Sequence, residues 1–358
     1  MPLRDWLKKP ASAAASLDTS GWDEYPVHLM DGSKLNHKVV GWMLRFDDVL
    51  DADVLHSALT RLLGVKDWRK LAGRLRRDAN NKDRLKIVVP TEFSSALPAV
   101  EYQHTVFPQT ISSHAVGAHV ARPTETPTAQ PLPKELSGFM APEGYPDTVD
   151  GLVQSSKAQL ALTVSSFADA TLVSLAFPQT LLDASGLVGL VRNWSLVLDG
   201  RHDDVATMLD PRRDVLDEVA RENQAVAPQD CRMEKMRLTG FAYLKLMGRH
   251  VAEAAQRRRR LQALYIPRDV YQRLLVRLGR DDGADEVHLL TAWLVDVIAA
   301  QESAPRPVTL ITLYDLRSCV RKLSDVCAGA GARLISQVLT SSYCASFPAD
   351  ALRGGGSG

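Results

Sequence analysis

Phe177-Pro-Gln-Thr-Leu-Leu-Asp-Ala-Ser-Gly186 joins the apolar run TLVSLAF to an amphipathic run that ends at Gly200. The first run predicts a strand that stops at Pro178, and the second predicts a helix that begins after Asp183. The tight turn between them carries polar side chains, a common way to present functional groups to a pocket. From residue types alone, a purely structural turn anchored by Asp183 remains an open alternative.

The sequence around this stretch predicts an α/β fold. Residues 35–46 and 84–90 have the composition of strands, and residues 158–177 predict two strands joined at Ala168-Asp169. Asp51 is expected to cap a helix, and 108–150 and 211–230 are expected to be an irregular stretch and a linker. The expected buried face of that helix consists of Val54, Leu55, Ala58, Leu59, Leu62 and Leu63.

The chain's length of 358 residues favours two domains. The predicted boundaries are an N-terminal domain over 1–225, a basic crossover segment over 226–262 and part of a C-terminal domain over 263–358. The last part predicts a strand and a helix in LYIPRDVYQRLLVRLGR, a helix in DEVHLLTAWLVDVIAAQ and a strand in VTLITLYDLRSCV.

The composition excludes several classes of protein. A net charge of +1 gives no global reason to expect nucleic acid as a partner, and no apolar run is long enough to span a membrane. The four cysteines form no CxxC pair and no zinc-finger spacing, so neither a metal site nor a disulfide framework is expected. No signal peptide is recognisable, and a cytoplasmic location is expected.

One local charge feature leaves an alternative open. The basic helical region over 231–262 ends in the run Arg257–Arg260, which is compatible with contact to nucleic acid or to phospholipid. Few aromatic residues are interleaved with these arginines, and the rest of the chain is neutral. We therefore expect no nucleic-acid partner.

The stretch FPQTLLDASG resembles the His-x-x-x-Asp motif of the BAHD-type, acyl-CoA-dependent acyltransferases, in the context typical of their fungal branch, which includes trichothecene 3-O-acetyltransferases. Asp183 stands at the motif's aspartate, Gly186 at its following glycine and Gln179 at its histidine. Further segments resemble the fungal branch in the same order along nearly the whole chain: LNHKVVGWMLRF, DWRKLAGRLR, KELSGFMAPEGYPDT, DEVHLLTAW and YDLRS.

This resemblance implies a two-domain, chloramphenicol-acetyltransferase-like α/β sandwich with a solvent channel. In the family, the histidine takes a proton from the acceptor hydroxyl, which then attacks the thioester of acyl-CoA. The resemblance thus implies acyl-CoA as co-substrate, a small-molecule acceptor and no permanently bound cofactor. It also implies that Asp183 is structural and pairs with Arg317 of the YDLRS strand.

Two departures from the family bear on activity. A glutamine amide donates and accepts hydrogen bonds but has no basic lone pair, so Gln179 cannot act as a general base. The family's Asp-Phe-Gly-Trp-Gly motif near the C-terminus is absent, and family members are longer. The resemblance therefore implies an incomplete second domain in this chain, and a separate C-terminal fragment is one way to complete it.

Three functions are compatible with this sequence. The first is an O-acyltransferase acting on a secondary-metabolite hydroxyl, with Gln179 in place of histidine. The second is a repurposed acyltransferase fold that binds a metabolite and guides a cyclisation or isomerisation, for which positioning matters more than a base. The third is a non-catalytic pseudoenzyme.

Overall fold

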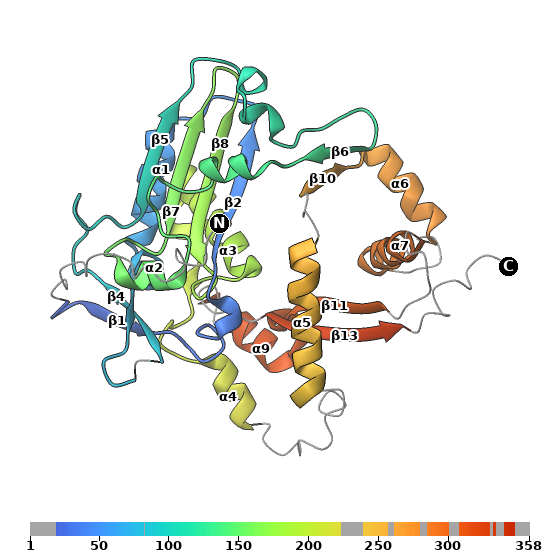
Figure 1. Cartoon of the computed structure of the whole chain (residues 1–358). Coiled ribbons are helices and arrows are strands. Elements are labelled where there is room, and N and C mark those ends of the chain that lie inside the picture. The colour runs from blue at the N-terminus through green and yellow to red at the C-terminus, as the bar shows by residue number, and fades with distance from the viewer. Residues whose placement is uncertain are drawn as a thin grey trace. The chain divides into compact units, whose positions relative to one another are not determined.

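The structure is a computed structural model that describes residues 19–81, 83–222, 239–256, 261–279, 285–300, 308–329, 332–333 and 340–347 (Figure 1). The chain divides into two compact units. Unit 1 comprises 1–114, 137–224 and 315–339, and unit 2 comprises 115–136, 225–314 and 340–358. The basic run Arg257–Arg260 lies outside the described residues.

A four-stranded sheet forms the centre of unit 1. Its order is β2 (Val39–Phe46), β8 (Thr171–Pro178), β7 (Ala161–Ser166) and β5 (Glu101–Val106). Strand β8 pairs antiparallel with both neighbours, whereas β5 runs parallel to β7. Every residue of β7 and β8 is buried, as expected for central strands. The two strands predicted within 158–177 are therefore present, and the second carries the motif at its end.

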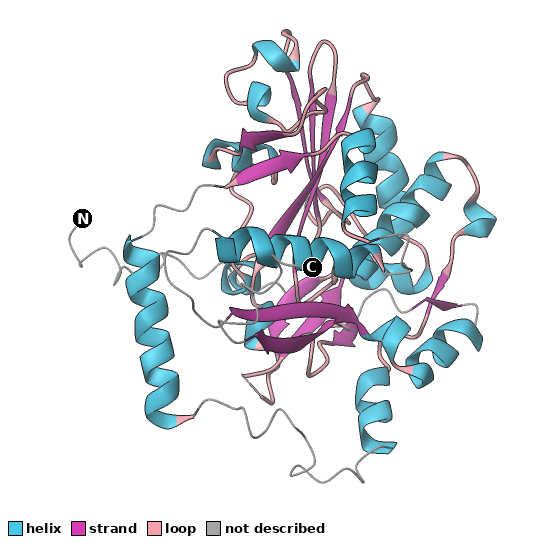
Figure 2. Cartoon of the chain, turned by 90° about the vertical axis from the view of Figure 1, so that its right-hand side faces the viewer, coloured by secondary structure: helices cyan, strands magenta, loops and turns pink. Residues whose placement is uncertain are grey.

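Two helices supply the main core against this sheet, α1 (Ala52–Leu63) and α3 (Ala184–Leu198). Figure 2 shows helices along one side of the long strands. Asp51 caps α1 by accepting hydrogen bonds from the backbone N–H groups of Asp53 and Val54, as predicted. The prediction was wrong for the side chain of Val54, which is 52% exposed because it lies at the edge of the buried stripe.

Strand β2 is shorter at its start than the sequence predicted. Residues Lys34–Asn36 form the 3₁₀-helix η2, and the strand begins only at Val39. The physical reason lies in side-chain hydrogen bonds to the preceding loop, from Asn36 Nδ2 to Met30 O (2.8 Å) and between His37 Nε2 and Gly32 O (3.1 Å). These bonds hold the backbone in a turn and compete with extension.

A second sheet of unit 1 has the order β1 (Asp23–Pro26), β4 (Leu85–Val89) and β3 (Arg74–Arg77), all antiparallel. The strand predicted up to Pro90 is thus confirmed as β4. The segment 108–150 is not wholly irregular, because it also contains short elements that depend on tertiary contacts. The short elements of this segment are η4 (Ile111–Ser113), η5 (Gly117–His119), β6 (Thr128–Pro131) and η6 (Lys134–Phe139), and α2 (Val149–Gln154) begins at its end. Two further short elements lie outside it, η3 (Lys66–Ala72) and η7 (His202–Asp204).

The region predicted as a linker over 211–230 contains helix α4 (Val215–Glu222), so the prediction was wrong there. The reason is a small hydrophobic core formed by residues that are far apart in the sequence. Val215 of α4 packs against Leu323 of α9 (Arg321–Gly329), and both side chains are fully buried. Three further short elements belong to unit 1: β9 (Thr207–Met208), α8 (Leu316–Cys319) and β12 (Ala332–Arg333), which pairs parallel with β9.

Unit 2 contains two two-stranded sheets and three α-helices among its described residues. Strand β10 (Gln262–Tyr265) pairs antiparallel with β6, and β11 (Val308–Asp315) lies beside β13 (Thr340–Phe347). The helices are α5 (Gly240–Gln256), α6 (Arg268–Arg277) and α7 (Glu286–Ala300). The strands and helices predicted after residue 262 are present in the predicted order.

The two units are discontinuous in sequence, whereas the sequence predicted two continuous domains joined by a crossover segment over 226–262. Pairing of β6 with β10 assigns residues 115–136 to unit 2. Packing of α9 on α4 and pairing of β12 with β9 assign residues 315–339 to unit 1. Both assignments depend on partners far away in the chain, which local composition does not reveal.

A buried cluster of charged and titratable side chains holds the N-terminal loop of unit 1 in place. Lys70 and Asp31 are 1% and 2% exposed, and His28 Nε2 donates to Pro211 O at 3.2 Å while its Nδ1 lies 3.7 Å from Asp214 Oδ2. Burial lowers the pKa of Lys70 to about 8, although nearby carboxylates, Asp31 foremost, act in the opposite direction.

This cluster makes stability depend on pH in the alkaline range. Unfolded, Lys70 has its ordinary pKa of 10.5, so between about pH 8 and pH 10.5 the unfolded chain binds the proton more tightly than the folded chain. The free energy of unfolding should therefore rise over this window, by about 3 kcal/mol at most from this residue. Urea unfolding at pH 8, 9 and 10 measures it, and Lys70→Met should lack this contribution. Equal slopes for both proteins would contradict the expectation.

Candidate active site

The motif turn begins where β8 ends, in the middle of its sheet. Val39 of β2 pairs with Pro178, and one further backbone hydrogen bond, from Gln179 N to Lys38 O (2.8 Å), extends the pairing beyond the strand. A bond from Leu181 N to Pro178 O (2.9 Å) closes the turn. Leu181 and Leu182 are fully buried and hold the turn in place. The backbone of residue 179 is thus fixed on both sides.

Gln179 is half-buried at the start of this turn. Lys38, its backbone partner, directly precedes β2, is exposed and was not among the residues expected at the site. Only the strand register brings it there, so no local sequence signal identifies it. The Thr180 hydroxyl is buried and, within the described residues, has no hydrogen-bond partner. A buried hydroxyl normally has a hydrogen-bond partner, so the Thr180 hydroxyl can still form a hydrogen bond with water or a ligand.

Asp183 serves as the N-cap of α3. Its Oδ1 accepts a hydrogen bond from Gly186 N at 2.9 Å. The cap therefore needs a residue with a backbone N–H at position 186. Its Oδ2 accepts from Arg317 Nη1 at 2.8 Å. The side chains are 5% and 13% exposed, so this ion pair is buried. The structure therefore brings together Asp183, Gly186 and Arg317, and it directs Asp183 into the protein framework.

Asp315 completes this network and was noticed in the sequence only as part of YDLRS. Its Oδ1 accepts from Arg317 Nη1 (3.0 Å), and its Oδ2 accepts from Ser185 Oγ (2.6 Å). Burial acts to raise the pKa of Asp315, but the hydrogen bonds from Ser185 and Arg317 outweigh it and hold the pKa below its ordinary value. Burial likewise acts to lower the pKa of Arg317, and its bonds to Asp183 outweigh it and raise the pKa. Asp315 and Arg317 are therefore both charged at neutral pH.

Four of the histidines with described side chains have partners away from Gln179. His104 Nε2 lies 3.0 Å from Ser166 Oγ, His56 stacks on Tyr102, and His202 Nε2 lies 3.2 Å from Arg61 Nη1. His37 is closest to the motif along the pairing, but its Nε2 faces the Gly32 carbonyl, to which it donates. In the part of the chain that the structure describes, no histidine forms a hydrogen bond with the Gln179 side chain.

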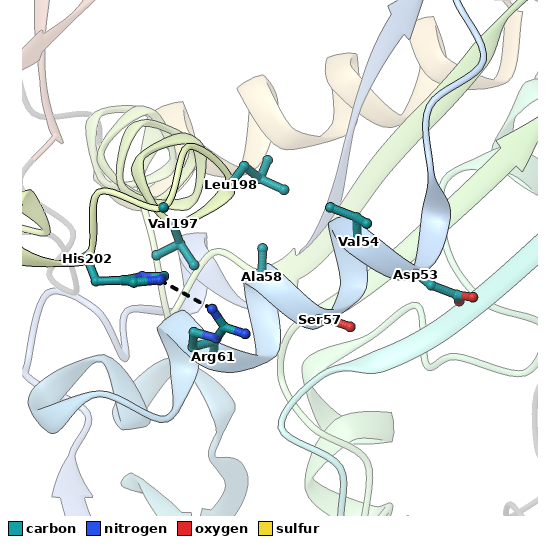
Figure 3. A pocket seen from close by; sticks show the side chains of 9 residues that line it. Asp53, Val54, Ser57, Ala58, Arg61, Val197, Leu198 and His202 are labelled. Carbon is teal, nitrogen blue, oxygen red and sulfur yellow. Dashed lines mark hydrogen bonds between the residues drawn. The ribbon is translucent and has the colours of Figure 1, made fainter.

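A surface groove of about 380 Å³ lies between α1 and α3 (Figure 3). Its lining combines apolar side chains with polar ones, including Asp53, Ser57, Arg61 and His202. Val197 and Leu198 line it from the end of α3 opposite Asp183, about 20 Å along the helix. None of its residues belongs to the motif turn, so the groove is separate from the candidate site.

Among the described residues, no group of three His, Cys, Asp or Glu side chains is arranged to hold a metal ion. Cys319 is the cysteine whose side chain is described, and it is an exposed free thiol. Within the described ranges, no helix is long and apolar enough to cross a bilayer.

Sequence comparison finds curated relatives among fungal acetyltransferases. The chain is 29% identical over 315 residues to the O-acetyltransferase PaAT-2 of Phomopsis amygdali, covering 82% of this chain and 64% of that protein. It is 30% identical over 329 residues to the acetyltransferase BOT5 of Botryotinia fuckeliana, covering 88% of this chain and 59% of that protein. The chain thus spans about three fifths of the length of these relatives. No family model matches it.

Structure comparison finds the same fold. The crystal structure of F. sporotrichioides TRI101 complexed with coenzyme A and T-2 superposes with a TM-score of 0.58 at 12% identity. The superposition covers 93% of this chain and 71% of that one. The chain is therefore similar in sequence to fungal acetyltransferases and shares the fold of a CoA-bound structure, which supports the resemblance to BAHD-type acyltransferases that its sequence motifs implied.

Proposed function

We propose that this chain belongs to an acyl-CoA-dependent O-acyltransferase that acts on a secondary-metabolite hydroxyl, with Gln179 at the position of the general base. The observation that carries the proposal is the motif turn itself. Asp183 is locked to Arg317 at 2.8 Å, while residue 179 is held at the strand end by a backbone bond to Lys38. This strand–turn–helix geometry supports the proposal. The residue type at position 179 is the departure from the family's motif.

In this proposal the polar groups of the turn position the reactants. The amide of Gln179 can orient an acceptor hydroxyl or a thioester carbonyl by hydrogen bonding, but it cannot carry the acceptor's proton. Acyl transfer would then have to proceed without the factor of about 10² to 10⁴ that a general base supplies. The curated relatives support the reaction class because they are named acetyltransferases. We also propose a cytoplasmic location.

The proposal includes completion of the fold by further polypeptide. The chain matches three fifths of its relatives, and unit 2 exposes large apolar side chains on α7 and β11, among them Val287, Ile298 and Leu313. Apolar surface of this kind is commonly covered by a partner surface. We propose a C-terminal fragment, supplied as a separate polypeptide, as the partner that covers this surface.

Calorimetry with CoA tests the co-substrate. We expect the purified chain to bind CoA, because the similar fold of TRI101 was crystallised with CoA. ATP, titrated under the same conditions, is the control for unspecific binding of an adenine nucleotide. Saturable binding of CoA but not of ATP would support the proposal. If CoA and ATP give the same heats, or if neither binds after the C-terminal fragment has been supplied, acyl-CoA is not the co-substrate of this chain.

The repurposed fold is the second candidate, and one observation favours it: no described histidine forms a hydrogen bond with the Gln179 side chain, and glutamine itself is no base. A cyclisation or isomerisation needs a shaped pocket more than it needs a base. Mass spectrometry of hydroxylated metabolites incubated with the chain, without acyl-CoA, distinguishes the two candidates. A product of unchanged mass and altered retention time supports the second, and an inert chain that only binds metabolites would be a pseudoenzyme.

A further inference from the structure

Helix α5 presents a surface that the proposed acyl transfer does not use. Every side chain that the structure describes on this helix is exposed. Among them are large apolar ones, with Phe241 82%, Leu244 65% and Val251 67% exposed. The stability of a helix in a protein comes mostly from burial of its apolar side, so a helix exposed in this way is expected to dock on another surface.

The apolar side chains of α5 share one side of the helix. Phe241, Leu244, Met247 and Val251 recur at intervals of three or four residues and form a stripe, with Tyr243 at its margin. Lys245 and Arg249 lie on the other side, as does Ala242. Leu246 is the exception, since it falls outside the stripe. At 1.5 Å per residue the helix is about 25 Å long.

The charge around α5 indicates what kind of surface it meets. Residues 232–260 contain nine lysines and arginines and two glutamates, in a chain whose net charge is only +1. Positive charge is therefore concentrated in this stretch of the sequence, and Lys245 and Arg249 of this stretch lie on α5. An apolar stripe backed by basic residues is typical of helices that lie in the plane of an anionic membrane surface.

We propose that α5 docks on an anionic lipid surface, with its stripe (Phe241, Leu244, Met247 and Val251) at the boundary between headgroups and acyl chains. Lys245 and Arg249 then lie at the level of the headgroup phosphates. This is peripheral attachment, and it is compatible with the absence of a bilayer-crossing helix from the described ranges. Nucleic acid is less suited to this surface, because its backbone offers phosphates but nothing to bury Phe241 or Leu244.

Co-sedimentation with vesicles tests the proposal on the whole chain. We expect binding to vesicles of equal parts phosphatidylcholine and phosphatidylserine and much weaker binding to phosphatidylcholine alone. Binding should weaken as salt is raised above about 0.1 M, where surface charges are increasingly screened. A nucleic-acid mobility-shift assay is the parallel arm. Absence of binding to the anionic vesicles, or binding to nucleic acid instead, would overturn the proposal.

Two matched variants locate the contact. Leu244→Glu places a carboxylate in the stripe and should lower vesicle binding roughly tenfold or more, since a buried leucine is lost as well. Ala242→Glu adds the same carboxylate on the opposite side, two residues away, and should have a much smaller effect. Both positions are exposed, so both variants should fold, and circular dichroism verifies this. Equal losses would mean that charge alone acts and that the stripe does not insert.

Sedimentation equilibrium tests whether a second copy of the chain, rather than lipid, covers α5. If α5 packs on a second copy of the chain, the wild type will be a dimer that Leu244→Glu dissociates, with no binding to vesicles by either, and the lipid proposal fails. CoA binding should be the same in wild type and Leu244→Glu. Failure of vesicle binding therefore leaves the proposed acyltransferase untouched, and loss of CoA binding leaves the lipid surface untouched.

Discussion

Substituting histidine for Gln179 should raise the rate of acyl transfer by about 10²- to 10⁴-fold, the factor that a positioned general base typically supplies. Histidine has an ordinary pKa near 6.5 and can take up and release a proton at neutral pH, which an amide cannot. The turn should accept it, because the backbone of residue 179 is fixed by bonds that do not involve the side chain. The half-buried position also leaves access for an acceptor. Release of free thiol from acetyl-CoA, with a panel of hydroxylated acceptors, measures the rate.

The control for this gain is Gln179→Asn, which changes the side chain and adds no base. Its rate should stay at or below that of the unmodified chain. The rate of Gln179→His should also fall as the pH drops through about 6.5, because the protonated imidazole is no longer a base. If Gln179→His stays silent while the unmodified chain converts a metabolite, the acyltransferase proposal fails and the repurposed fold is favoured.

Replacing Asp183 by alanine should destabilise unit 1 by about 3 to 5 kcal/mol, the usual cost of breaking a buried ion pair from one side. Arg317 is 13% exposed and would keep Asp315 as its carboxylate partner, but it would lose the bond of 2.8 Å to Asp183. The same substitution removes the N-cap of α3, because Gly186 N loses its acceptor. The midpoint of urea unfolding, followed by circular dichroism, measures the loss.

Asp204→Ala is the matched control for this loss. Asp204 also pairs with an arginine, Arg201, at 2.7 Å, but these side chains are 54% and 59% exposed. Exposed pairs contribute about 0 to 1 kcal/mol, so this variant should unfold close to the wild type. Equal midpoints for Asp183→Ala and Asp204→Ala would refute a structural role for the buried pair. A folded Asp183→Ala protein that has lost acyl transfer in the Gln179→His background would instead indicate a part in the chemistry.

The elements that sequence predicted best are those whose ends are set by neighbouring residues. Asp51 and Asp183 cap helices through backbone groups two or three residues away, so a local pattern is sufficient to find them. Strands β7 and β8 are rich in apolar residues and buried along their whole length, and a turn separates them. The prediction failed where a distant partner decides the structure, as at α4, which forms because Leu323 packs on Val215.

The candidate site divides in the same way. The residue type at 179 is a property of the sequence, and with it the absence of a general base, since no fold gives an amide a usable proton affinity. The family resemblance implied that Arg317 pairs with Asp183, and the structure has this bond across 134 residues. The tertiary structure alone decided the other contacts, because Ser185 meets Asp315 across 130 residues and Lys38 meets the motif through backbone pairing. Such contacts depend on how distant strands and helices pack, and local sequence patterns contain no record of that packing.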